Sequence, residues 1–314
     1  MGNTYAPLHG LNDLRLFGNN VSYNSVDVTE EGGWGPVRTF QVASSEVRSG
    51  DRVTIEPGNF CRRCDQCLAG KYNVCPQSSF HANVALYPGC IGRYFQYPGH
   101  LVHRLPDAVS DEEGAVVEPL SVAVHACRRA GVTAGTTLLV TGGGCIGLLC
   151  LAAAKAFGAT NILVTDIKAS SLAMAKKMGA DHTLLVASGD AQSQAGQVRQ
   201  LMGCMPDVTL ECSGTQAGLC LGIYATKSRG KVVQVGLSGA TVTVPLVHAG
   251  VREVDVLGVY RFVQCFPITI SLLAKKKVDV KPLITHRFEF DEYKKAFEMF
   301  RSGEDGAIKC MISC

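Results

Sequence analysis

Short apolar runs alternate with helical patterns through the middle of this chain. Thr137–Thr141 is an apolar run with β-branched residues, and a glycine-rich turn joins it to an apolar stretch over Leu148–Phe157. A second run follows over Asn161–Thr165. The two runs predict buried strands, and the stretch between them predicts a buried helix that Gly158 closes. This order favours an α/β fold with a parallel, doubly wound sheet.

The alternation continues to about residue 259. Further strands are predicted over His182–Val186, Val208–Cys212, Lys231–Val235 and Val254–Val259. The helices between them are predicted over Ser170–Met178, Gln192–Met202 and Gln216–Thr226. With 314 residues, the chain is long enough for this sheet and for a second domain with its own core.

The turn after the first strand has the pattern G-x-G-x-x-G, at Gly142, Gly144 and Gly147. The pattern follows a strand, opens a helix and has an acid, Asp166, at the end of the next strand, as a dinucleotide site requires. Gly142 permits a tight turn, Gly144 admits a pyrophosphate, and Gly147 lets the helix approach the strand. Asp166 would bind ribose hydroxyls and repel a 2′-phosphate, which favours NAD over NADP. The alternative is a glycine turn that binds nothing.

Four cysteines lie within one polar loop, at Cys61, Cys64, Cys67 and Cys75. Four thiolates can close a tetrahedron around Zn²⁺, and sites of this closed kind are structural rather than catalytic. Disulfides and idle thiols are the alternatives. The two-residue spacing is typical of metal sites, so the sequence favours structural zinc.

Composition mainly excludes other classes of protein. A net charge of +3 is too small to favour nucleic acid or a membrane surface as partner. The longest apolar stretch, 145–154, stops at Lys155 and is too short to span a bilayer. Fourteen cysteines without a secretion signal predict a reducing compartment, the cytoplasm.

Several longer motifs resemble a known family. They are Gly50–Val53, Glu56–Gly58, the four-cysteine loop, Glu118–Val132, Thr243–Leu246, Arg252–Asp255, Val280–Phe288 and Ile308–Cys314. From about Ser49 onward, the chain is similar to the zinc-containing medium-chain dehydrogenases, and most of all to their polyol-oxidising members. The resemblance implies NAD-dependent and zinc-dependent oxidation of sorbitol or a related polyol to the ketose.

The resemblance also implies a domain organisation. A GroES-like, β-rich catalytic domain would comprise residues 1–119 and 265–314, with the four-cysteine zinc loop at 61–75. A Rossmann NAD-binding domain would comprise residues 120–264. The implied partner is a small polyol or ketose, with no nucleic acid and no membrane. A homo-oligomer, either a dimer or a tetramer, would form through the Rossmann domain.

Individual residues match functional positions of the family. Glu118 matches a carboxylate beside the catalytic zinc, Arg261 matches an arginine that binds substrate hydroxyls, and Phe262 replaces a substrate-site tyrosine. Ser171 replaces a basic residue that usually helps to hold the adenosine end of the cofactor. The cofactor-lining matches are Gly142, Gly144, Ile146, Gly147, Asp166, Val235, Gly236, Leu237, Val259, Tyr260 and Arg261. In the alternative interpretation, Glu118 caps a helix and Arg261 forms a surface ion pair.

The family's ligands for a catalytic zinc are missing. Leu11–Leu16 resembles the family's first strand. After that strand, family members carry a Gly-Ile-Cys-Gly-Ser-Asp segment and a Gly-His-Glu segment. No cysteine precedes Cys61, and the earliest histidine is His9. A catalytic zinc needs about three protein ligands, and His9, His81 and Cys90 do not have ligand spacing. We therefore expect an incomplete catalytic domain and impaired activity. The alternative function is a non-catalytic, NAD-binding isoform that is stabilised by zinc and modulates oligomers.

Overall fold

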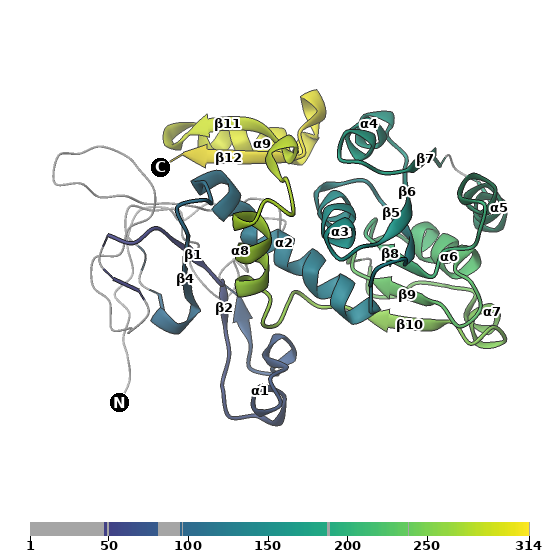
Figure 1. The fold of residues 1–314 in the computed structure, drawn as a ribbon, viewed down its shortest axis with the longest axis horizontal. Coiled ribbons are helices and arrows are strands. Elements are labelled where there is room, and N and C mark those ends of the chain that lie inside the picture. Colours follow the sequence, from purple (N-terminus) through teal and green to yellow (C-terminus); the bar gives the residue numbers. More distant parts are fainter. Residues whose placement is uncertain are drawn as a thin grey trace.

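The computed structural model describes residues 47–48, 50–80, 95, 97–186, 189–237 and 239–313. Two bodies lie side by side, and the long helix α2 (Asp111–Ala130) runs from one toward the other (Figure 1). One body contains a six-stranded sheet, and the other contains three two-stranded sheets. The strand expected over Leu11–Leu16 and the candidate ligands His9, His81 and Cys90 lie outside the described residues.

The six-stranded sheet is parallel throughout. Its strands are β5 (Thr137–Thr141), β6 (Thr160–Asp166), β7 (His182–Leu185), β8 (Val208–Glu211), β9 (Lys231–Gln234) and β10 (Asp255–Gly258). Their order is β10-β9-β8-β5-β6-β7, so the strand order reverses between β5 and β8. This is the doubly wound Rossmann arrangement, in which ligands bind at the reversal point. The predicted strands are confirmed, each to within one residue at either end.

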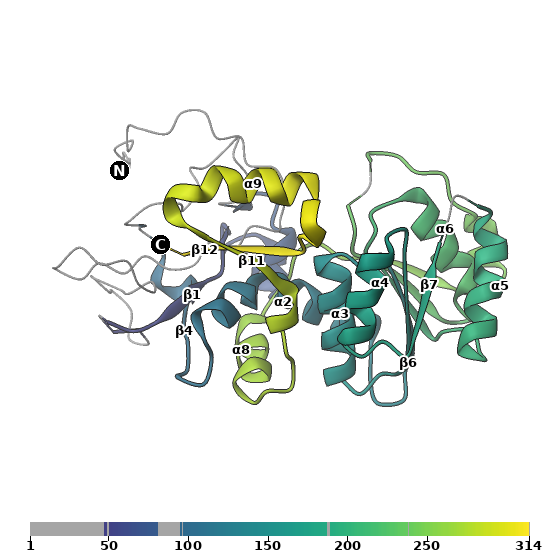
Figure 2. The same cartoon turned by 90° about the horizontal axis from the view of Figure 1, so that it is seen from above.

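Helices cover both faces of this sheet (Figure 2). They are α3 (Cys145–Ala156), α4 (Ala169–Lys177), α5 (Ala191–Met202), α6 (Gln216–Ala225) and the short α7 (Leu246–Gly250). Leu138 and Val140 of β5 belong to the core cluster with α2 and α3, whereas Leu139 packs with α5 and α6. Alternate residues of one strand thus fill two cores. The predicted helices are confirmed, although α3 begins three residues earlier than expected.

The helix α2 has a well-defined start and end. The Ser110 hydroxyl accepts a hydrogen bond from the Glu113 amide (3.2 Å), and the Glu113 carboxylate accepts one from the Ser110 amide (2.8 Å), which forms a capping box. Gly131 ends the helix in the left-handed conformation (φ 74°). Glu118 lies well inside α2, so the alternative interpretation that it caps a helix is wrong.

The expected domain boundary at Leu120 also falls inside α2. Buried Ser121 contacts Thr269 of α8 (Phe266–Ala274), with 3.0 Å between the two hydroxyl oxygens. The apolar side chains of α2 pack on α3 and on α8 in one continuous core. A single rigid helix therefore belongs to both bodies.

The second body is assembled from distant segments of the chain. In it, β1 (Val53–Ile55) pairs antiparallel with β4 (Val102–Arg104), and β2 (Gly58–Asn59) pairs antiparallel with β3 (Ser79–Phe80). Near the carboxyl end, β11 (Ile284–Glu289) pairs parallel with β12 (Lys309–Ser313), and α9 (Tyr293–Ser302) packs on both. Short helices complete it: α1 (Asp65–Leu68), η1 (Tyr72–Val74), η2 (Gly99–Leu101), η3 (Lys281–Leu283), η4 (Phe290–Glu292) and η5 (Glu304–Gly306).

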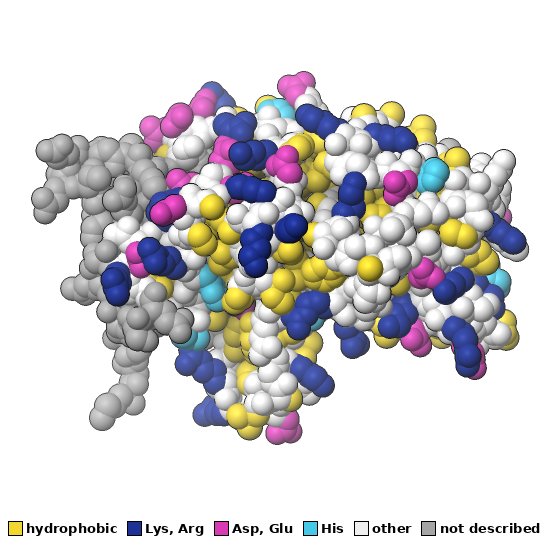
Figure 3. Space-filling model, in the orientation of Figure 1, with side chains coloured by type: hydrophobic (Ala, Val, Ile, Leu, Met, Phe, Trp, Pro, Cys, Tyr) yellow, Lys and Arg dark blue, Asp and Glu magenta, His cyan; other side chains and the backbone are white. Residues whose placement is uncertain are grey.

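The face seen in Figure 3 carries basic and acidic side chains that are interspersed rather than gathered by sign. The small net charge of +3 agrees with this distribution. Among the described residues, the apolar helices are all too short to reach across a lipid bilayer.

Candidate active site and metal centre

The glycine-rich turn follows β5 at the point where the sheet order reverses. Gly142 has φ +93°, and a Cβ there would lie 2.7 Å from the Ser213 amide nitrogen. A Cβ at Gly147 would lie 1.8 Å from the carbonyl oxygen of Gly142. By contrast, a Cβ at Gly144 would have no atom within 4 Å. Two glycines are thus required by the protein's own packing, and the third borders open space, where a pyrophosphate could approach the helix.

Asp166 ends β6 beside this turn. One of its carboxylate oxygens accepts a hydrogen bond from the Gly143 amide (2.7 Å), and the other accepts one from the Lys168 amide (2.7 Å). A Cβ at Gly143 would lie 3.3 Å from the Ser171 Cβ, so Ser171 borders the same site. These contacts fix the carboxylate at the edge of the turn, as the sequence pattern requires.

A second acid supports the site, and sequence reasoning missed it. Glu211 ends β8 and is almost fully buried. Its Oε1 accepts hydrogen bonds from the amides of Ser213 (2.8 Å) and Gly214 (3.0 Å). Burial raises the pKa of Glu211, against those stabilising hydrogen bonds. The carboxylate shapes the loop that packs against Gly142. An acid at the end of an apolar strand was the signal that could have identified it.

The end of β9 completes the edge of the site. A Cβ at Gly236 would lie 2.2 Å from the Gly214 amide nitrogen, so these two turns are in close contact. Val235 is buried, whereas Leu237 exposes 69% of its surface, as expected for a residue at the rim of an open site. Ile146 and Val259 are partly buried against the core. The expected cofactor-lining residues thus gather at the carboxyl ends of β5, β6, β9 and β10.

Charged groups meet beside the turn. Glu118 of α2 and Lys309 of β12 interact electrostatically with each other and with Cys145, the first residue of α3. Burial raises the pKa of Glu118 to about 7, against the attraction of the cationic Lys309 and Arg261. Lys309 is fully buried, and that burial lowers its pKa. In the sequence, Lys309 belongs to the motif Ile308–Cys314, and that motif assigned the residue no role.

Arg261 approaches the same cluster from the segment after β10. Its guanidinium carbon lies 3.9 Å from the ring centroid of Phe80 and 4.7 Å from that of Tyr260. One guanidinium nitrogen, Nη1, is buried without a hydrogen-bond partner. No described carboxylate lies within ion-pair distance of it. These surroundings do not fit the alternative of a surface ion pair. They suit a guanidinium that donates to a bound ligand.

Phe262 belongs to the hydrophobic core. Its side chain is only 3% exposed, and its ring centroid lies 5.3 Å from that of Phe266 in the core. Phe262 is therefore a core residue, and its ring offers no polar group to a substrate.

The four-cysteine loop forms a compact metal centre. We call residues 58–80 the cysteine lobe; they comprise β2, α1, η1 and β3. The sulfur atoms of Cys61, Cys64, Cys67 and Cys75 all lie within 4.8 Å of one another. The distance between Cys61 Sγ and Cys67 Sγ is 3.9 Å, and so is that between Cys64 Sγ and Cys75 Sγ. A tetrahedron with Zn–S bonds of about 2.3 Å has sulfur atoms roughly 3.8 Å apart. The residues therefore fit a closed zinc site.

The chemistry of these thiols also suits a metal. Backbone amides of Arg63 and Cys64 lower the pKa of Cys61 to about 6, which favours the thiolate. Burial and hydrogen bonds with neighbouring thiols raise the pKa of Cys67 to about 12. A dication would hold all four sulfurs as thiolates and remove this conflict. The four cysteines are free rather than joined as disulfides, so the disulfide alternative is wrong.

A catalytic zinc does not fit the described residues. In the described ranges, the cysteine lobe is the only group of three or more metal-ligating side chains with convergent atoms. Glu118 is surrounded by Lys309, Arg261 and Cys145 rather than by histidines. One carboxylate beside two cations would not hold a divalent ion.

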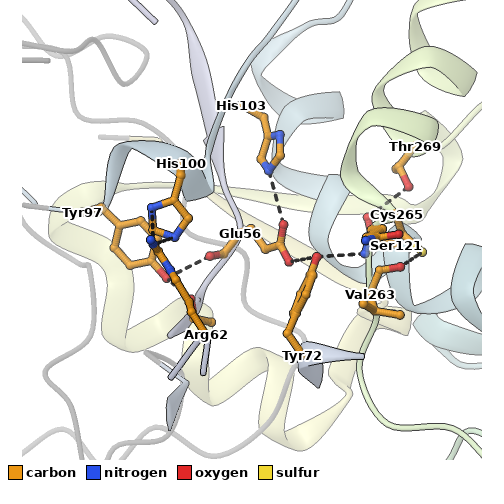
Figure 4. A network of polar contacts seen from close by, with 12 residues as sticks. Glu56, Arg62, Tyr72, Tyr97, His100, His103, Ser121, Val263, Cys265 and Thr269 are labelled. Carbon is orange, nitrogen blue, oxygen red and sulfur yellow. Dashed lines mark hydrogen bonds and ion pairs between the residues drawn. The ribbon is translucent and has the colours of Figure 1, made fainter. Parts of the chain in front are cut away.

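A polar network joins the cysteine lobe to the rest of the second body (Figure 4). At its centre is Glu56, which is only 4% exposed. Glu56 accepts a hydrogen bond from the Tyr72 hydroxyl (2.8 Å), and its other oxygen lies 3.3 Å from His103 Nε2. The Tyr97 hydroxyl donates to the backbone carbonyl of Glu56 (2.8 Å).

Comparisons with known proteins agree with this geometry. A family model for zinc-binding dehydrogenases matches residues 145–275, and one for the alcohol dehydrogenase GroES-like domain matches residues 28–107. The sorbitol dehydrogenase of Macaca fascicularis is 46% identical over 280 residues, which cover 89% of this chain and 78% of that protein.

Solved structures give the same result. A dehydrogenase of unknown specificity from Escherichia coli superposes with a TM-score of 0.80 at 33% identity, and the match covers 86% of this chain and 78% of the other. L-Idonate 5-dehydrogenase from Escherichia coli has a TM-score of 0.77 at 27% identity, with 88% and 79% covered. The fold and the site thus define a two-domain dehydrogenase with a Rossmann sheet. The chain belongs to the zinc-containing medium-chain dehydrogenase family.

Proposed function

We propose that this protein oxidises a secondary hydroxyl of sorbitol or a related polyol to the ketose, with NAD⁺ as hydride acceptor. One observation carries the proposal. The glycine turn with Asp166 lies directly beside a cluster of Glu118 and Arg261, which gives a cofactor site next to groups that can hold hydroxyls. The similarity to sorbitol dehydrogenases supports the choice of a polyol.

In the proposed reaction, the carbon atom loses a hydride to the nicotinamide and the hydroxyl loses a proton. Arg261 would donate hydrogen bonds to substrate hydroxyls through its unpartnered nitrogen. Glu118, with a pKa of about 7, can exchange a proton at neutral pH. The Asp166 carboxylate would accept from the adenosine ribose, so that NAD is favoured over NADP.

The two zinc roles differ. We assign a structural zinc to the cysteine lobe, where it would tie the loop together. A catalytic zinc in relatives of this kind polarises the substrate oxygen. Since Glu118 and Cys145 belong to no set of three convergent metal ligands in the described part of the chain, we expect slow turnover.

A direct experiment measures zinc per chain together with NADH production from sorbitol and NAD⁺. One zinc per chain with slow but measurable NADH production supports the proposal as stated. Absence of turnover in protein that binds NADH and holds one zinc would refute an active dehydrogenase. Two zincs with fast turnover would show that ligands outside the described residues complete a catalytic site.

The oligomeric state, the domains and the compartment belong to the same proposal. Strand β10 is an edge strand of the sheet, and the neighbouring Val247, Val251 and Val256 are exposed. An uncovered apolar edge of this kind supports a homo-oligomer formed through the Rossmann domain. That domain would extend over residues 120–264, between the parts of the catalytic domain. The described cysteines are free, which supports a cytoplasmic location.

A further inference from the structure

We propose that the cysteine lobe is a positioning device for Arg261, and that metal bound by its four thiolates sets the conformation of the segment 259–265. The inference rests on the proposed role of Arg261 in holding the polyol. Three separate contacts connect the lobe to this segment, although nearly 190 residues of sequence separate them.

The first contact is made by Asn73, which lies in η1 between the last two cysteines of the lobe. Its side-chain amide donates a hydrogen bond to the backbone carbonyl of Tyr260 (2.9 Å). Asn73 is 7% exposed, whereas its neighbour Val74 is 47% exposed. A buried amide with a fixed acceptor holds the residue directly before Arg261 in place.

The second contact is made by Tyr72. Its hydroxyl accepts a hydrogen bond from the Gln264 amide (2.8 Å) and donates its own proton to Glu56 (2.8 Å). Glu56 is in turn close to His103 of β4. Tyr72 therefore ties the far end of the Arg261 segment to the buried centre of the second body, and Figure 4 shows the contacts that run from Tyr72 through Glu56 to His103.

The third contact is made by Phe80 of β3, the strand that closes the lobe. The Arg261 guanidinium stacks on the Phe80 ring, with 3.9 Å between the guanidinium carbon and the ring centroid. Phe80 is buried, and it pairs with Gly58 across the two strands at the base of the lobe. A guanidinium on an aromatic face is held by electrostatic attraction and by packing.

The segment itself needs such support. Arg261 has φ 52° and Gln264 has φ 51°, so two residues with side chains adopt the left-handed conformation within four positions. Residues other than glycine persist in this region only when their surroundings hold them there. Asn73 holds the segment at Tyr260, and Tyr72 holds it at Gln264. Arg261 therefore lies between the two held residues, and Gln264 is itself one of them.

The lobe in turn depends on its metal centre. Its regular structure consists of two strands of two residues, the four-residue α1 and the three-residue η1. Helix α1 has no buried residue. Cys67 and Cys75 flank η1 in the sequence, so a metal would fix Tyr72 and Asn73 from both sides. A segment with so few buried side chains opens readily without a cross-link.

The test compares amide hydrogen exchange of segment 259–265 in the zinc-loaded protein, in the protein after zinc removal by a chelator, and in two variants. Tyr72→Phe removes the acceptor for Gln264, and Asn73→Asp removes the donor to Tyr260. Val74→Ala is the matched control, because it changes an exposed residue of the same η1 helix. Zinc content is measured for each variant.

We expect at least about tenfold faster exchange in segment 259–265 after zinc removal and in both variants, with unchanged protection in β5, β8 and β9. We expect both variants to keep their zinc, and Val74→Ala to behave as the unmodified protein. In kinetics, the KM for polyol should rise about tenfold while the KM for NAD⁺ stays the same.

Unchanged exchange in the segment after zinc removal and in both variants would overturn the inference. So would a uniform loss of protection over the Rossmann sheet, because that result would make the lobe a general stabilising element. Should the protein show no polyol turnover, the proposed function fails on the assay of NADH production. The exchange measurements still decide whether the lobe positions Arg261.

Discussion

In the glycine turn, the same substitution at two positions should have different consequences, one for cofactor affinity and one for stability. Gly144→Ala should weaken cofactor binding and leave the fold intact. Gly147→Ala should destabilise the fold. Both residues lie in the same pattern and both substitutions add one methyl group, so each variant is the control for the other.

The magnitudes follow from the space around each glycine. Gly144 has φ −73° and ψ −175°, which alanine adopts freely, and no atom lies within 4 Å of the added Cβ. We expect a stability change below about 0.5 kcal/mol. A methyl group facing the pyrophosphate should lower the affinity for NADH at least about tenfold, or roughly 1.4 kcal/mol.

At Gly147, the added Cβ would lie 1.8 Å from the Gly142 carbonyl oxygen and 3.4 Å from Val140 Cγ1. Because Cβ atoms rarely come closer than about 3 Å to such an oxygen, the helix start must move by about 1 Å. The buried side chains of α3 oppose that shift. We expect a loss of about 3 kcal/mol in the free energy of unfolding and a Tm lower by roughly 10 °C.

The assays are urea unfolding for stability and titration of NADH fluorescence for affinity. Full NADH affinity in Gly144→Ala would show that the pyrophosphate does not lie against this residue. Unchanged stability in Gly147→Ala would refute the close approach of α3 to the turn.

Three further predictions concern charge and metal. Asp166→Asn keeps a hydrogen-bond acceptor but removes the negative charge. The ratio of NADH to NADPH affinity, measured by fluorescence titration, should therefore fall at least about tenfold. An unchanged ratio would exclude Asp166 from the ribose site. Burial and the nearby Arg128 and Arg129 lower the pKa of His125 to about 4, below its unfolded value of about 6.5. The neutral imidazole therefore stabilises the fold above pH 6.5, and this contribution to the free energy of unfolding is lost as the pH falls toward 4. The loss should be about 2 kcal/mol between pH 6.5 and 5, and a His125→Gln variant should lack it in urea unfolding; equal pH dependence in the two proteins would contradict this. Cys64→Ser should abolish zinc binding, as measured by elemental analysis, while the Rossmann sheet stays folded by circular dichroism; full zinc retention would rule out the tetrahedral centre.

The Rossmann half of the fold could be predicted from sequence because each of its signals is local. The strand Thr137–Thr141 has an apolar centre, Leu-Leu-Val, between two β-branched threonines, and turns follow at its ends. The glycine pattern and Asp166 likewise lie within one strand, turn and helix unit. The predicted boundary at Leu120 stays a prediction; it falls inside α2, and a helix pattern does not reveal which bodies the faces of that helix will contact.

The parts of the site that depend on distant contacts could not be predicted in this way. Nothing local to Asn73 indicates that its amide will bind Tyr260. Lys309 follows an ordinary turn, and only the assembled structure shows that its ammonium group is buried beside Glu118. The four cysteines were the exception, since one short loop contains the whole ligand set.

The helix α2 has a practical consequence for anyone who divides this protein. A Rossmann fragment that starts at Leu120 would discard the first half of the helix, including the capping box of Ser110 and Glu113. It would also lose Val116 and Val117, which are now almost fully buried, and would expose the surface that these two side chains cover. A fragment that starts before Ser110 would keep the helix whole and would carry Glu118 with it. An NAD-binding fragment that keeps α2 whole therefore already includes a residue of the proposed reaction centre.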